Sequence, residues 1–149
     1  MQENRFTDRR ALSLMFLRFS LGALMIVWGL DKFVNPAHGV LVATKFYFGL
    51  PMHSFMPLWG VLQLALGSLV ILGLARRIAY PTLAVATGLT MVGVWRSILD
   101  PWGWMLKGSN ALFFPSLIIF AGALLLIAFR DDDVLVLGTP AARAHAHGS

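Results

Sequence analysis

Two polar side chains stand out because they lie inside long apolar runs. Arg18 lies within the run 12–30, and Gln63 lies within the run 56–74. An ionisable side chain inside an apolar helix is costly, and it marks either a functional site or a polar contact between helices. If the two helices are neighbours, the two residues differ in depth by about one helical turn, and we expect an Arg18–Gln63 hydrogen bond. The alternative is that the Arg18 guanidinium bends back to the lipid headgroups.

Glycines share the helical faces of these two polar residues. Gly22 and Gly29 lie on the face of Arg18, and the other helix has the same pattern, with Gly60 and Gly67 beside its glutamine. Small residues at this spacing allow helix backbones to approach closely. We therefore expect both faces to pack against protein. The polar pair then either joins the two helices or holds a small lipophilic ligand, and both interpretations stay open.

A second candidate site lies at the opposite end of the predicted helices. Its residues are charged or aromatic and lie at helix ends or in loops: Lys32, Trp59, Arg96, Trp102 and Trp104. The cations could attract a ligand entering from outside, whereas the tryptophans could equally be ordinary anchors at the membrane interface. We expect the connections 31–55 and 99–109 to form a lid over this end.

The groups needed for other chemistries are missing. The chain has no cysteine, which excludes disulfides, thiolate nucleophiles and iron–sulfur ligation. No histidine falls within the apolar runs, so a bis-histidine haem site is also excluded there. There is no pattern of a hydrolase or a kinase. We therefore predict no catalytic residue, no metal site and no cofactor bound by the chain's own ligands.

The elements that position these residues are predicted to be membrane helices. Of the 149 residues, 58% are hydrophobic and 13% are charged, about half the charge of a soluble domain. Four apolar runs are each about long enough to cross a bilayer: 12–30, 56–74, 78–98 and 110–129. We predict an all-α, integral membrane four-helix bundle with antiparallel up-down topology as a single domain over 1–133, followed by a disordered tail at 134–149.

The distribution of basic residues predicts the orientation. The formal net charge is +5, but the basic residues are scattered over short connections and form no stripe that would bind nucleic acid. More of them lie in the N-terminal tail, at 76–77 and after 129 than at the opposite end. The positive-inside rule then places these segments and both termini in the cytoplasm. The lipid bilayer is the first predicted partner of this multi-pass chain.

Two stretches resemble the DoxX-like (DoxX/DoxD) family of small integral membrane proteins: LRFSLGALMIVWGLDKFVNP and GVLQLALGSLVILGLARRIA. The resemblance covers about 12–129 and implies a four-helix protein of the bacterial cytoplasmic (inner) membrane. The family usually has glutamate at the position of Gln63. The titratable acid that would pair with Arg18 is therefore missing here, and proton-coupled roles assigned to that acid do not carry over.

The resemblance also implies a redox setting, because DoxD relatives are associated with thiosulfate:quinone oxidoreduction and others with redox stress complexes. Together with the missing reactive groups, it favours an accessory or anchoring subunit of a redox complex, without a catalytic centre of its own. Other membrane or periplasmic subunits would be its partners, and a quinone would be the implied cofactor. The alternative is a binding protein or carrier for a small lipophilic molecule such as a quinone. A transporter is disfavoured, because transport sites need more polar groups than these runs contain.

Overall fold

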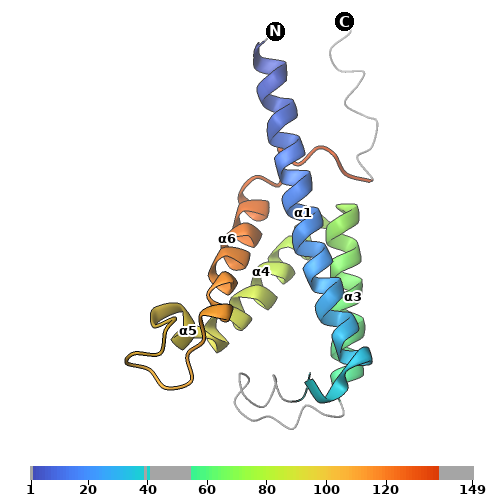
Figure 1. Cartoon of the computed structure of the whole chain (residues 1–149). Helices are drawn as coiled ribbons and strands as arrows, with labels where there is room; N and C mark the ends of the chain where they lie inside the picture. The colour runs from blue at the N-terminus through green and yellow to red at the C-terminus, as the bar shows by residue number, and fades with distance from the viewer. Residues whose placement is uncertain (1, 39, 41–54, 138–149) are drawn as a thin grey trace, which may run out of the picture.

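The computed structural model describes residues 2–38, 40 and 55–137, and it is all-helical over them (Figure 1). The elements are α1 (Gln2–Val34), α3 (Met56–Leu72), α4 (Arg76–Gly93), α5 (Trp95–Leu99), the short 3-10 helix η2 (Ala111–Phe113) and α6 (Pro115–Ala128). The predicted all-α class is confirmed for this part of the chain.

The four long helices are arranged as two pairs. α1 packs along α3 and α4 packs along α6, while smaller contacts of α3 with α4 and of α1 with α6 connect the pairs. In Figure 1 the pairs converge near the α3–α4 turn and diverge toward α5. We call the converging end, with the turn at 73–75 and the segment 129–137, the junction end. The end with α5 and the segment 100–110 is the loop end.

The α1–α3 pair is held by direct backbone contact at glycines. A Cβ atom placed on Gly67 would lie 2.7 Å from the carbonyl oxygen of Gly22, and one on Gly22 would lie 2.9 Å from that of Gly67. Gly29 and Gly60 repeat this contact at 3.0 and 3.2 Å. These distances leave no room for a side chain between the helices. The prediction that the two glycine faces pack against protein is confirmed.

The buried core lies toward the junction end and takes residues from all four long helices: Leu14, Leu21, Met25, Val70, Ala79, Tyr80, Leu83, Ala84, Ala123 and Leu126. Large apolar side chains also cover the outside of the helices. Phe16 is 74% exposed and Ile78 is 72% exposed. Such an outer surface is expected where helices face lipid.

Two of the four predicted apolar runs are helices with shifted ends. The run 12–30 is the middle part of the much longer α1, and the run 56–74 ends as α3 at Leu72. The helix ends there because Gly73 adopts a left-handed conformation with φ of 68°, and the following N–H groups bond back to carbonyls of the last turn.

The other two runs are not single helices. The predicted helix 78–98 is interrupted after Gly93, a residue that is unfavourable inside a helix, and continues as α5. The Ser97 hydroxyl of α5 accepts a hydrogen bond from the Asn110 N–H at 3.0 Å, which ties α5 to the loop. The predicted helix 110–129 begins as η2, and α6 starts at Pro115 because proline is tolerated in the first turn of a helix.

Two segments of the described chain are long and apolar enough to cross a membrane. They are Arg9–Val34 and Ala111–Ala128. α3 is apolar as well but has only 17 residues. By length and composition the two segments are candidate membrane spans.

Candidate functional site

The central polar feature of the structure is a buried ion pair between α1 and the segment after α6. Arg18 is 2% exposed and Asp133 is 0% exposed. The Arg18 Nη1 atom lies 3.1 Å from both carboxylate oxygens of Asp133. Its Nη2 atom donates to the Leu135 carbonyl oxygen at 2.6 Å. Two charges that would be costly to bury alone are therefore buried as a pair.

A tyrosine from a third helix completes this cluster. The Tyr80 hydroxyl of α4 donates to the Asp133 Oδ2 atom at 2.5 Å, and Tyr80 is itself fully buried. The carboxylate therefore accepts from α1 and from α4 at the same time. We call Arg18, Tyr80 and Asp133 the junction cluster, because it connects the two helix pairs where they converge.

The chain on both sides of Asp133 is held in place by further hydrogen bonds. Arg76 Nη1 donates to the carbonyl oxygens of Arg130 and Asp133, at 2.7 Å each. The Leu137 N–H donates to the Leu72 carbonyl oxygen at 3.1 Å. A disordered tail was predicted over 134–149, whereas residues 134–137 run along the bundle and cover Arg18. The rest of that tail, 138–149, lies outside the described residues.

Gly73 makes room for this arrangement. A Cβ atom there would lie 2.7 Å from the Arg18 Nη1 atom and 2.4 Å from the Val136 side chain. The residue also has the positive φ that glycine adopts without strain. Glycine at this position is therefore required twice, once by the helix end and once by the guanidinium.

The geometry of the junction cluster suits a structural contact better than a reaction. The carboxylate of Asp133 is occupied by the guanidinium and the phenol, and both charged groups are closed off from solvent. A general acid or base must reach the group with which it exchanges a proton. Solvent does not reach the charged groups of the cluster, and the arginine and the aspartate neutralise each other's charge.

The predicted hydrogen bond between Arg18 and Gln63 is not formed. Arg18 lies level with Gly73 at the end of α3, and Gln63 lies ten residues earlier, about 15 Å away along that helix. A carboxylate within reach also binds a guanidinium more strongly than an amide does. The headgroup alternative is wrong as well, because the guanidinium is buried.

Gln63 is left without its expected partner. Its Oε1 atom is buried and has no hydrogen-bond partner within the described part of the chain. The only other buried side-chain atom of that kind among the described residues is the Nε of Arg18. An orphaned buried acceptor is uncommon and calls for an explanation.

The candidates at the loop end do not form one site. Lys32 and Trp59 belong to the α1–α3 pair, and Lys32 Nζ donates to the Trp28 carbonyl oxygen at 2.9 Å. Arg96 belongs to α5, where it lies over the Trp95 ring at 5.6 Å, and Trp102 and Trp104 follow it in the loop. Figure 1 shows α5 and this loop well apart from the loop-end termini of α1 and α3. The described residues therefore form no lid, and 39 and 41–54 lie outside them.

The loop after α5 has a well-defined shape of its own. The Asp100 carboxylate accepts hydrogen bonds from the backbone N–H groups of Trp104 at 3.1 Å, Met105 at 2.7 Å and Leu106 at 2.7 Å. These backbone donors lower the pKa of Asp100 below its ordinary value, because they favour the charged form. Trp102 and Trp104 stack with their ring centres 5.4 Å apart.

This loop also exposes its largest apolar side chains. Trp102 is 71% exposed, Trp104 is 81% exposed and Met105 is 88% exposed. Residues 100–106 thus form a small, braced, aromatic projection, which we call the aromatic loop.

Sequence reasoning missed Tyr80 and Asp133 as partners of Arg18. A signal was present, because the acidic run 131–133 directly follows an apolar helix at the end of the bundle where Arg18 lies. Among the described residues, no group of three His, Cys, Asp or Glu side chains is placed to hold a metal ion. Comparison of the chain with protein-family models, with curated proteins and with solved structures gave no match.

Proposed function

We propose that α1, α3, α4 and α6 cross a bacterial cytoplasmic membrane, with the junction end facing the cytoplasm. The two candidate spans and the exposed apolar side chains support the membrane location. The basic residues at the junction end support the orientation, because arginines accumulate in cytoplasmic connections: Arg10, Arg76, Arg77 and Arg130. Fractionation with an alkaline carbonate wash, followed by protease accessibility of the 73–75 turn, tests both parts.

We further propose that the protein is a non-catalytic accessory or anchoring subunit that binds another membrane or periplasmic subunit. The observation that carries this proposal is the aromatic loop. Tryptophan and methionine are enriched at protein interfaces, and a braced loop loses little conformational freedom on binding. The junction cluster fits the same function, since its charged groups are used to join helices.

The redox setting of the proposed complex is supported by the resemblance of 17–36 and 60–79 to DoxX-like proteins. In this proposal the partner subunit contains the reactive centre, and any quinone is bound by the complex. The present chain then contributes membrane attachment and a docking surface for the partner.

Gentle solubilisation and affinity purification, followed by identification of co-purifying polypeptides, test this function. We expect the wild-type chain to retain a partner that the double variant W102A/W104A loses. F16A is the matched control, because Phe16 is a comparably exposed aromatic residue on α1, away from the loop. A wild-type chain that is always solitary, or that shows turnover by itself, would contradict the proposal.

One observation favours a second function, a carrier for a lipophilic molecule with a hydroxyl group such as a quinol. The unpartnered Oε1 atom of Gln63 could accept a hydrogen bond from such a hydroxyl. We expect Q63L to lower ubiquinol retention in detergent, with S68A on the same helix as the control. Equal retention by Q63L and wild type would eliminate this function.

A further inference from the structure

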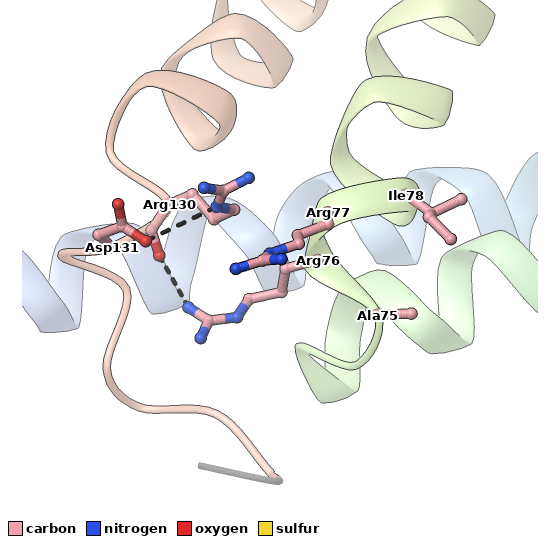
Figure 2. A pocket seen from close by; sticks show the side chains of 6 residues that line it. All are labelled: Ala75, Arg76, Arg77, Ile78, Arg130 and Asp131. Atoms are coloured by element: carbon pink, nitrogen blue, oxygen red, sulfur yellow. Dashed lines mark hydrogen bonds and ion pairs between the residues drawn. The ribbon is translucent and has the colours of Figure 1, made fainter. Parts of the chain in front are cut away.

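A hollow at the junction end is lined largely by arginines (Figure 2). It has a volume of about 290 Å³ and is lined by Ala75, Arg76, Arg77, Ile78, Arg130 and Asp131. Figure 2 shows the side chains of Arg76 and Arg77 extending from the start of α4 toward Arg130. Three arginines and one aspartate give the lining a formal charge of +2. The hollow is therefore suited to an anion.

The arginines that line this hollow have N–H groups that a ligand can use. Arg76 uses only its Nη1 atom in the bonds to backbone carbonyls described above, and Arg77 is exposed. The Nε atom of Arg130 lies 3.7 Å from a carboxylate oxygen of Asp131, and the Asp131 side chain is 94% exposed. An exposed ion pair of that length contributes little stability. An incoming anion can therefore bind Arg77 and Arg130 without breaking the fold.

The start of α4 adds to the positive potential of the hollow. Its N-cap residue, Ala75, makes no side-chain hydrogen bond, and the first helical turn contains no acidic residue. The first N–H groups of a helix that lacks a cap carry the positive end of the helix dipole. The first residues of α4 line the hollow, and oxyanions bind helix N-termini readily.

One wall of the hollow is apolar. Ile78 lines it and is 72% exposed. A soluble phosphate would gain nothing from this side chain, whereas a lipid could place its glycerol and upper acyl chain against it. The combination of guanidinium groups that have unused donors with an exposed aliphatic side chain suits the headgroup and upper chain of a phospholipid.

We propose that this hollow binds the phosphate of an anionic phospholipid of the cytoplasmic leaflet. The inference rests on the proposed membrane orientation but not on the proposed partner. Arg77 and Arg130 donate to the phosphate oxygens, the positive end of the α4 dipole adds to the attraction, and Ile78 contacts the lipid chain. Asp131 opposes the anion and weakens its binding.

Native mass spectrometry of the full chain in detergent tests the proposal, with phosphatidylglycerol and phosphatidylcholine of the same acyl chains as probes. R77Q/R130Q removes both charge-assisted hydrogen bonds to the phosphate and should bind phosphatidylglycerol at least about 10-fold more weakly. R9Q/K107Q removes the same charge from exposed sites outside the hollow and should bind like wild type. D131N should bind more tightly than wild type. Unchanged melting temperatures would show that the folds are intact.

Equal phosphatidylglycerol binding by the two double variants would overturn the site. Equal affinity of the wild type for inorganic phosphate and phosphatidylglycerol would overturn the lipid as its occupant. Because lipid binding is measured on the isolated chain, a failed search for partner subunits leaves this result unaffected. Release of the chain by the carbonate wash would instead refute the membrane location.

Discussion

Replacing Arg18 with methionine should destabilise the protein strongly, because it leaves a buried carboxylate without its counter-ion. Asp133 is 0% exposed, and among the described residues its carboxylate would retain only the Tyr80 hydroxyl as a partner. Breaking one side of a buried ion pair costs about 3–5 kcal/mol. Methionine fills much of the volume of the arginine stem, so most of this loss comes from the charge.

The neighbouring ion pair between Arg10 and Asp132 provides a matched control. Its N–O distance of 3.2 Å is close to the 3.1 Å of the buried pair, but its side chains are 57% and 43% exposed. Exposed pairs contribute about 0–1 kcal/mol. R10M should therefore be nearly neutral, although it removes the same type of residue from the same helix.

Thermal unfolding in detergent, followed by circular dichroism, distinguishes the two variants. For a chain of this size, 1 kcal/mol corresponds to a shift of about 2–4 °C in melting temperature. R18M should therefore melt about 6–20 °C below wild type, and R10M at most about 4 °C below. The double variant R18M/D133L should recover part of the loss, because it removes both charges together.

Equal shifts for R18M and R10M would refute the assignment of Arg18 to a buried pair. A double variant that loses the full sum of R18M and D133L would show that the two residues act independently. Either result would mean that the junction cluster does not hold the helix pairs together.

Three further changes have defined outcomes. Y80F removes a hydrogen bond to a charged group and should lower the free energy of unfolding by about 1.5–3 kcal/mol in the same assay, whereas an unchanged melting temperature would contradict the contact between the phenol and Asp133. G67A should lower the free energy of unfolding by about 1–3 kcal/mol, because the new Cβ atom would meet the backbone of α1. G88A should lower it less, because its Cβ atom would meet only the movable Phe120 ring. The reverse order would argue against close contact between α1 and α3. In the folded protein the pKa of Asp100 lies below the ordinary value of 3.8. The charged carboxylate therefore stabilises the aromatic loop at pH values above 3.8, and this stabilisation is lost as the pH falls through the folded pKa. Tryptophan fluorescence should therefore change on acidification in the wild type, while D100N should show the altered spectrum already at neutral pH.

The sequence predicted those parts of the fold that depend on local pattern. The apolar runs predicted the helical class, and the glycine spacing predicted which faces of α1 and α3 pack closely, because backbone contact excludes every larger residue. The break after Gly93 was not predicted, since the hydrogen bond between Asn110 and Ser97 that ties α5 to the loop exists only where the loop folds back.

The polar site was predicted only in part. Arg18 was identified because a charge in an apolar run is costly wherever the chain folds. Its partner was predicted wrongly. The depths of Arg18 and Gln63 were counted from the ends of the apolar runs, but α1 extends well beyond the run 12–30, so those ends do not mark equal depths. Asp133 looked like the start of a solvated tail, and only the path of residues 134–137 buries it.

The ion pair between Arg18 and Asp133 joins residues 115 positions apart in the chain. Ribosomes add about 5–20 residues per second, so roughly 6 to 23 s separate the synthesis of the cation from that of its anion. During this interval the nascent first helix carries an unmatched positive charge, and a chain that stops before residue 133 never neutralises it. The buried pair between α1 and the segment after α6 therefore forms only after translation has passed all four long helices.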